Sequence, residues 1–212
     1  MMVTQAVDVI DASGHVDPSS PAPGQLEKIR RFVNTLDLEA GSDALTTPAA
    51  LTAWLAAHDL LSNGAGGTAS AAEVAQAVAL REAFRAVLIT HVQPAQDEPG
   101  VPPVPALREL AAGLPIQLAI SDDGQVRAEP AADGATGSLT RLLLIAADAA
   151  TTGTWTRLKV CGADDCRWAF YDRSPTKTGC WCTMSICGSR AKSRSYRRRA
   201  KRRPDRVSSE PA

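Results

Sequence analysis

Apolar residues recur at intervals of three and four over several segments of the first half of the chain, which is the spacing of amphipathic helices. A first helix is expected from Gln25 to about Asp37. A second helix should begin at Pro48, because Thr47 can accept a free backbone N–H and proline suits the first helical turn. The apolar pattern of this second helix ends near Leu61.

A longer helix is predicted to begin at Ala71. The sequence from Ser70 to Glu73 has the capping-box pattern, in which each of these two side chains satisfies a backbone N–H at the other's position. The apolar spacing continues to Pro94, which cannot extend a helix. Residues 93–105 contain five prolines, so an extended connection should follow.

One β-hairpin is predicted after a short helix over residues 107–112. Apolar residues alternate along residues 116–120 and 126–128, and the sequence Asp122-Asp123-Gly124 between them is a turn signal. The apolar run from Leu139 to Ala149 then predicts a helix at the centre of the core. The first part of the chain is therefore expected to be mainly α with a β-hairpin.

Composition and the lengths of apolar runs exclude several classes of protein. With 44% hydrophobic and 22% charged residues, the chain is near the globular average, which argues against wholesale disorder and coiled coil. The longest apolar run, Leu142 to Ala147, is far shorter than the roughly 18 residues of a membrane span, so no membrane partner is expected. The N-terminal region lacks the pattern of a secretory signal, so we expect a cytoplasmic location, with residues 1–24 as a disordered lead-in.

Charge is distributed very unevenly, although the net charge is zero. Residues 1–156 hold 8 Lys or Arg against 18 Asp or Glu, a net charge of −10. Residues 157–206 hold 15 basic against 4 acidic residues, a net charge of +11. An acidic body with a basic C-terminal arm is typical of proteins that present one end to a polyanion.

All five cysteines lie in one short segment. Cys161, Cys166, Cys182 and Cys187 form the pattern C-x4-C-x15-C-x4-C, and four thiolates complete the tetrahedral coordination of one structural zinc ion. An iron–sulfur cluster uses the same ligand set, and a disulfide pair is a further alternative. Using Cys180 as a ligand would break the equal spacing, so we interpret it as a packing residue or an oxidisable thiol.

Short strands and aromatic residues should build the zinc module. Residues 154–160 predict a strand that ends at the first cysteine, and residues 168–171 predict a second short strand. We expect Trp168 and Trp181 to cover the metal site, since so small a module needs its aromatic side chains for packing more than for base stacking. The predicted module is a small α+β zinc finger, either treble-clef-like or ribbon-like.

A basic helix is predicted directly after the last cysteine, with Ser189 as its N-cap. Basic residues fall at helical spacing, and none of the residues from Arg190 to Arg203 is acidic, whereas a solvated helix usually mixes both signs. Phosphate is the obvious counter-charge, because arginine binds phosphates and guanine edges. The predicted nucleic-acid contacts are Arg190, Lys192, Arg194, Arg197, Arg198 and Lys201.

Candidate sites in the acidic body are few. Asn34, Thr35 and Asp37 could line a ligand pocket, but the favoured alternative is that they end the helix and bond its last carbonyls or the next loop. His58 and His91 lie on different predicted helices without an evident nucleophile or carboxylate beside them. The sequence has no phosphate-binding loop, nucleophile elbow or His-Glu metal motif, so the chain is not expected to be an enzyme.

The residues around the cysteines closely resemble the CGNR zinc finger. The resemblance is carried by Cys161 to Trp168, Phe170 to Ser174, Trp181 to Met184 and Cys187 to Lys192. It implies that the four cysteines of the two C-x4-C pairs hold zinc. Ser189 stands where the family motif has Asn, and both residue types are good helix N-caps. Cys180 replaces a residue that is commonly basic, which removes one phosphate contact.

The upstream chain is similar to the ABATE domain, which precedes this finger in the same family. The similar segments are Phe32 to Asp37, Ala49 to Leu61 and Leu80 to Ala83. Together the two resemblances imply a bacterial, stress-induced transcription regulator. We expect an ABATE-like helical domain over residues 25–156, the finger with its basic helix over residues 157–203, and a disordered tail over residues 204–212.

Three functions compete at this point. In the primary hypothesis the chain is a zinc-dependent regulator whose basic arm binds duplex DNA, while the first domain binds a small-molecule ligand or another subunit, a homodimer included. In the second hypothesis the basic arm holds an acidic protein or the chain's own acidic body. In the third hypothesis the same arm binds RNA.

Overall fold

The computed structural model describes residues 21–62, 67–92 and 104–201. Predictions on the tail, the proline-rich connection up to residue 103 and the first twenty residues of the lead-in lie outside this part of the chain. Its α-helices are α1 (Leu26–Val33), α2 (Pro48–Ala57), α3 (Ala71–Thr90), α4 (Val104–Ala112), α5 (Gly134–Thr151) and α6 (Ser189–Lys201). Short antiparallel pairs join β1 (Leu36–Asp37) to β2 (Ser42–Asp43), β3 (Ile116–Ile120) to β4 (Val126–Pro130), and β5 (Leu158–Val160) to β6 (Ala169–Tyr171).

The first helix is shorter than its apolar pattern predicts. It ends at Val33 rather than near Asp37, and the hydroxyl group of Thr35 donates a hydrogen bond to the carbonyl of Phe32. Leu36 and Asp37 instead pair with β2, in the register Leu36↔Asp43 and Asp37↔Ser42. A strand of two residues is too short to show an alternating pattern of apolar and polar residues, so the sequence did not predict the pairing of β1 with β2.

The second helix begins as predicted and ends early. The Thr47 side chain accepts a hydrogen bond from the backbone N–H of Ala50, and Pro48 occupies the first helical turn. The helix ends at Ala57 rather than near Leu61, because Asp59 adopts a left-handed backbone conformation with φ 52°. The bonds from Asp59 N–H to Ala56 O and from Leu60 N–H to Leu55 O close the helix end in a Schellman-type arrangement.

The third helix and the hairpin follow the sequence signals closely. Both reciprocal hydrogen bonds of the capping box between Ser70 and Glu73 are present at the start of α3. The hairpin β3–β4 pairs Leu118 with Ala128, and Gly124 in its turn has φ 80°, a conformation that glycine adopts without strain. The apolar helix after the hairpin is α5, in which Leu139 and Leu142 are fully buried.

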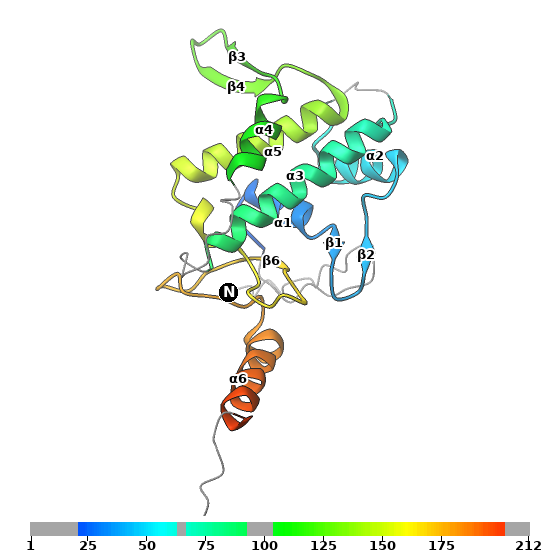
Figure 1. Cartoon of the computed structure of the whole chain (residues 1–212). Coiled ribbons are helices and arrows are strands. Elements are labelled where there is room, and N and C mark those ends of the chain that lie inside the picture. The colour runs from blue at the N-terminus through cyan, green and yellow to red at the C-terminus, as the bar shows by residue number, and fades with distance from the viewer. Residues whose placement is uncertain (1–20, 63–66, 93–103, 202–212) are drawn as a thin grey trace, which may run out of the picture.

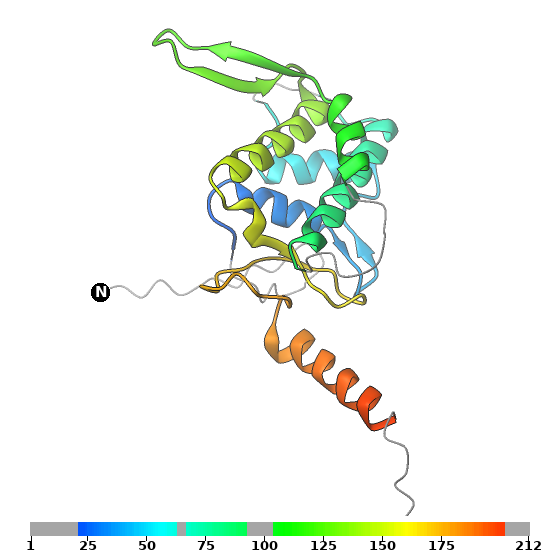
Figure 2. The ribbon, with the colours of Figure 1, turned by 60° about the vertical axis from the view of Figure 1, so that its left-hand side comes forward.

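The core of the helical body lies among α1, α2, α3 and α5 (Figure 1). Aromatic rings meet at its centre: Phe32 lies 5.5 Å from Trp54 and 6.5 Å from Phe84, between ring centroids. The hairpin β3–β4 projects from one end of this body, and α6 projects from the opposite end (Figures 1 and 2). No helix in the described segments is long and apolar enough to cross a membrane.

The strands that lead into the finger belong to the same core. Leu158, Val160 and Ala169 are completely buried and pack with the body rather than with the cysteines. The strand predicted over residues 154–160 is only half correct, because Trp155–Arg157 form a turn of 3-10 helix before β5 begins. The Trp155 ring lies edge-on against Phe84 and His91 and packs against the main core.

Candidate metal centre and basic helix

The first pair of cysteines lies on the loop that joins β5 to β6. Cys161 follows β5 directly, and its backbone N–H donates to the carbonyl of Trp168, which lies just before β6. The loop turns back through a bond from Cys166 N–H to Ala163 O, and Arg167 adopts a left-handed conformation with φ 51°. This tight turn presents both thiols on one side of the hairpin.

The second pair of cysteines lies at the start of the last helix. A turn of π-helix over Met184–Gly188 holds Cys187 and runs directly into α6. The sequence pattern predicted Ser189 as the N-cap, and this is wrong: Ser189 has helical backbone angles, and its hydroxyl group donates to the carbonyl of Met184. Helical backbone begins earlier, at Met184 after the extended residue Thr183, so Cys187 lies inside the helical turn and Cys182 just before it. The helix axis is thereby tied to the metal ligands.

The four predicted ligands converge on one point. The sulfur atoms of Cys161, Cys166, Cys182 and Cys187 all lie within 4.8 Å of one another. The sulfur atoms of Cys166 and Cys182 lie 3.7 Å apart, and those of Cys182 and Cys187 lie 3.6 Å apart. A tetrahedral zinc ion with Zn–S bonds of about 2.3 Å requires sulfur–sulfur distances of about 3.8 Å. The four cysteines are thus positioned to hold one structural zinc ion.

The electrostatics of the four thiols favour a bound cation. Hydrogen bonds from Cys166 and Cys182 hold the pKa of Cys161 far below its usual value. The same contacts with Cys161 raise the pKa of Cys166 and of Cys182, and burial raises that of Cys187. One thiolate thus opposes the ionisation of the other three. A divalent cation removes this conflict, because it stabilises all four thiolates together.

Aromatic and small residues enclose the metal centre. Trp168 and Trp181 pack with the cysteines, as the sequence predicted. A Cβ on Gly188 would lie 2.8 Å from the sulfur of Met184 and 3.3 Å from the Trp181 ring, so only glycine fits there without a shift. Cys180 lies outside the group of four ligands, and its thiol donates to the carbonyl of Thr178.

A buried ion pair organises the loop between the two cysteine pairs. The ammonium group of Lys159, 2% exposed, lies 2.7 Å from Oδ2 of Asp172 and also donates to the carbonyls of Lys177 and Gly179. Burial of Asp172 opposes its charge, but hydrogen bonds from Lys159, Ser174 and Gly179 hold its pKa well below the usual range. The sequence pattern did not predict this pair; its one signal there is a lysine inside an otherwise apolar strand.

The basic helix carries its charges on several faces, and two of its arginines contact acidic residues. Arg190 lies 2.8 Å from Glu39, in the loop between β1 and β2, and Arg194 lies 3.1 Å from Asp165, in the first cysteine loop. All four of these side chains are between about 40% and 56% exposed. Solvent therefore screens both pairs, and each contributes little to stability.

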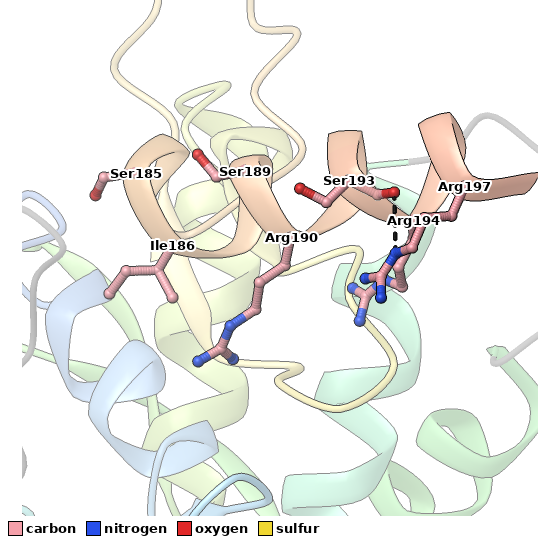
Figure 3. Close-up of a pocket in the computed structure, with 7 residues that line it drawn as sticks. All are labelled: Ser185, Ile186, Ser189, Arg190, Ser193, Arg194 and Arg197. Atoms are coloured by element: carbon pink, nitrogen blue, oxygen red, sulfur yellow. Dashed lines mark hydrogen bonds between the residues drawn. The ribbon is translucent and has the colours of Figure 1, made fainter. Parts of the chain in front are cut away.

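A shallow concave surface lies along the same side of the helix. Figure 3 shows its residues: serines and arginines of the π-turn and of α6, with the single apolar residue Ile186. The side chains of Arg190, Arg194 and Arg197 extend from the same side of the helix there. Lys192, Arg198 and Tyr196 are also exposed, Tyr196 to 71%. Of Lys201 only the helical backbone is described, and Arg203 lies outside the described residues.

The three polar residues after α1 have their own partners in the structure. Asn34 exchanges hydrogen bonds with the backbone of Ala169 in β6. Thr35 and Asp37 are buried; Thr35 bonds the end of α1, and Asp37 accepts hydrogen bonds from the backbone N–H groups of Glu39 and the next residue. Thr35 and Asp37 thus bond the end of the helix and the next loop, which is the alternative that the sequence favoured over a ligand pocket. The ligand-pocket interpretation stays a prediction.

Two arginines of α3, which no sequence signal singled out, hold this region together. Arg81, 2% exposed, binds both carboxylate oxygens of Asp43 and donates to the hydroxyl of Thr35. Arg85 donates to the carbonyls of Val33 and Leu36, and so satisfies the end of α1. The signal that could have revealed them is a pair of arginines spaced by four residues on an apolar helix face.

Both histidines have packing roles. His58 stacks on Trp54 with ring centroids 4.1 Å apart, and its Nδ1 lies 2.7 Å from the Trp54 carbonyl. His91 packs edge-on against Trp155, and its Nδ1 lies 2.8 Å from the carbonyl of Leu158. Burial lowers the pKa of both rings. His91 thereby joins the end of α3 to the first strand of the finger.

Comparison with protein families agrees with this division of roles. Residues 157–200 match the CGNR zinc finger, and residues 29–154 match the ABATE family, whose description is "putative stress-induced transcription regulator". None of the curated proteins compared with the chain matches it. Neither family is enzymatic by its description. Since the second match covers more than half of the sequence, the chain belongs to the ABATE family and carries a CGNR zinc finger that follows the ABATE domain.

Proposed function

We propose that this protein is a cytoplasmic, stress-responsive transcription regulator that binds duplex DNA through α6. The observation that carries the proposal is the helix itself: seven of its thirteen residues are Lys or Arg, none is acidic, and it projects away from the acidic body (Figures 1 and 2). A helix of this length is about 20 Å long, and the major groove of DNA admits an α-helix.

The metal centre supports this function by fixing the direction of the helix. Cys187 lies in the π-turn that continues into α6, and Cys182 lies two residues before that turn begins. Zinc bound by these thiols and by Cys161 and Cys166 would anchor the start of the helix to the strand loop. The zinc has a structural role, because four protein ligands leave no position for a reactive water.

The side chains of α6 divide into two groups in this proposal. Arg190, Arg194 and Arg197 share the serine-lined concave surface, which offers guanidinium and hydroxyl donors to phosphate oxygens. Lys201, eleven residues after Arg190, lies at a position that continues the stripe of these three arginines along the helix. Lys192 and Arg198 lie at other positions around the helix axis and would contact the opposite strand or base edges. These six residues remain the predicted nucleic-acid contacts, in agreement with the charge pattern of the sequence.

The test is binding of the zinc-loaded protein to a fluorescent duplex, measured by anisotropy over a range of salt concentrations. The logarithm of the binding constant should fall with the logarithm of the salt concentration, with a slope of about −0.9 for each phosphate neutralised. Arg197→Glu should weaken binding at least tenfold, whereas Arg108→Glu, an exposed residue on α4, should have no comparable effect. A slope near zero, or equal losses in both variants, would contradict the proposal.

Binding of an acidic protein segment is the second candidate function, and one observation favours it. Arg190 and Arg194 already bind carboxylates of the chain itself, so the same surface accepts acidic side chains as well as phosphate. Competition in the duplex assay separates the candidates. Displacement of the duplex by structured RNA at lower concentration than by unlabelled duplex would favour RNA, and displacement by an acidic peptide would favour a protein partner.

A further inference from the structure

The hairpin β3–β4 exposes more apolar surface than any other described strand pair. Ile116 is 50% exposed, and Leu118 and Ile120 are each 72% exposed. The hairpin extends away from the helical body, and among the described residues β3 pairs only with β4 (Figures 1 and 2). Isolated two-stranded hairpins are marginally stable in water, so such an element ordinarily gains a further strand or a covering partner.

The backbone of β3 is ready to accept another strand. The bonds from Ala131 N–H to Pro115 O and from Ser121 N–H to Gln125 O show that the odd-numbered residues of β3 direct their backbone groups toward β4. The N–H and C=O groups of Ile116, Leu118 and Ile120 therefore face the open edge. None of these three residues is proline, so every donor of that edge is available.

The two edges of the hairpin differ in how they are protected. The strand β4 carries Arg127, Glu129 and Pro130, and both charges and proline are common devices that prevent pairing at an edge. The strand β3, with the sequence Ile116-Gln117-Leu118-Ala119-Ile120, has neither a charge nor a proline. Pairing is thus discouraged at β4 and left open at β3.

We propose that β3 pairs with β3 of a second copy of this chain, antiparallel and centred on Leu118. The apolar positions of the strand read the same from either end, so Ile116 of one copy lies opposite Ile120 of the other and Leu118 lies opposite its own counterpart. A two-fold interface requires this kind of self-complementary surface. The product is a continuous four-stranded sheet in which aliphatic side chains of the two inner strands shield one another.

The choice of a second copy rests on this symmetry and on charge. The body of the chain is strongly acidic, and the uncharged β3 is a surface on which two such bodies can meet without like charges in contact. The hairpin lies at the end of the molecule opposite α6, so pairing there leaves both basic helices free (Figure 1). The dimer therefore does not depend on nucleic acid, and its test is separate from that of the proposed function.

The first experiment is sedimentation velocity on the zinc-loaded full chain over a range of micromolar concentrations. The parent protein should convert from monomer to dimer as its concentration rises. Leu118→Lys places two ammonium groups together on the two-fold axis and should raise the dissociation constant at least tenfold. Val126→Lys adds the same charge on β4 at a position that is also well exposed, 60% against 72% for Leu118, and should leave dimerisation unchanged.

Three outcomes would overturn the proposal: a parent protein that stays monomeric at every concentration, equal effects of the two lysine variants, or no effect of Leu118→Lys. Hydrogen exchange gives an independent readout of the register. The amides of Ile116, Leu118 and Ile120 should exchange more slowly as the dimer forms, while those of Gln117 and Ala119 should not change, because their backbone groups already face β4. Unchanged exchange at Leu118 in a dimeric sample would place the interface elsewhere and contradict the model.

Discussion

Asn34 of the helical body and Ala169 of the finger exchange two hydrogen bonds across 135 residues of sequence. The Asn34 amide donates to the Ala169 carbonyl at 3.0 Å, and the Ala169 N–H donates to the Asn34 Oδ1 at 2.7 Å. One side chain thereby acts toward β6 as a neighbouring strand would. Because Ala169 is the first residue of β6 and completely buried, this contact fixes the finger on the body beside Cys161 and Trp168.

We expect Asn34→Ala to destabilise the whole chain. The change leaves both backbone groups of Ala169 without their partner in a buried place, which costs about 2 to 3 kcal/mol of unfolding free energy. Urea unfolding of the zinc-loaded protein measures this loss of unfolding free energy. Gln25→Ala, an exposed residue at the start of α1 without a side-chain cap bond, serves as the control and should change stability little. Equal stability of the two variants would show that the body and finger do not depend on this contact.

Zinc content should separate the fifth thiol from the other four. Cys182→Ser removes a ligand from the cluster, so we expect zinc to be lost and α6 to lose its anchor. Cys180→Ser, two residues away, should keep one zinc per chain, because its sulfur lies outside the group. Elemental mass spectrometry on the purified variants, with circular dichroism for helix content, decides the matter. Iron in place of zinc, or loss of metal from the Cys180 variant, would contradict this assignment.

Loss of zinc should also weaken the body. Leu158, Val160 and Ala169 flank the cysteine loop and pack into the main core, so loosening the loop exposes these residues. A single cooperative unfolding transition should therefore move to lower temperature when a chelator removes the metal. Two separate transitions, with the upper one unaffected by the chelator, would mean that the body and the finger unfold independently.

Local signals predicted those parts of the fold that depend on neighbouring residues. The capping box at Ser70 and the Asp-Gly turn at Gly124 act within a few residues, and equal spacing of the cysteines identified the metal ligands without any knowledge of the fold. The predicted end of the second helix near Leu61 was wrong, because the helix stops at Ala57 and Asp59 adopts a left-handed backbone conformation. Aspartate adopts that conformation only occasionally, so its presence in the sequence does not predict a helix end.

Contacts between segments that are distant in the sequence could not be predicted from local patterns. Asn34 bonds a strand 135 residues away, and Arg81 binds Asp43 across 38 residues. Neither pair has a fixed spacing, so no periodic pattern records it. The same holds for Glu39 beside Arg190, which the charge count could predict only as a general attraction between an acidic body and a basic arm. Those contacts require the three-dimensional arrangement of α1, α3 and the finger.

The buried ion pair of Lys159 and Asp172 should contribute strongly to the free energy of unfolding, and this contribution should not change with pH over the neutral range. Asp172→Asn leaves the buried Lys159 without its counter-charge, which costs about 3 to 5 kcal/mol. Because the folded-state pKa of Asp172 is depressed, the stabilisation is present above the usual pKa of aspartate and is lost only as the pH falls toward the lower folded value.

The stability difference between parent and Asp172→Asn should therefore be the same at pH 8 and pH 6. Lys159→Met removes the other partner of the pair and should also destabilise the chain. Lys177→Met is its matched control, because it also removes one lysine charge but the exposed Lys177 side chain takes no part in the pair. A difference that shrinks between these two pH values, or a Lys159→Met variant as stable as the Lys177→Met control, would show that the pair contributes less than its burial indicates.

The acidic residues beside α6 should compete with nucleic acid for its first arginines. Glu39→Gln removes the carboxylate 2.8 Å from Arg190, and Asp165→Asn removes the one 3.1 Å from Arg194. Since each pair is half-exposed and worth less than about 1 kcal/mol, we expect each change to tighten duplex binding by about two- to fivefold at low salt. Glu109→Gln removes the same charge from an exposed position on α4 and corrects for the general effect of net charge. If Glu109→Gln raises affinity as much as Glu39→Gln does, then the long-range electrostatic field of the body, and not the contact with Arg190, limits binding. A gain confined to Glu39→Gln and Asp165→Asn would instead show that the body restrains the basic helix at two points. These points are the loop between β1 and β2 and the first cysteine loop.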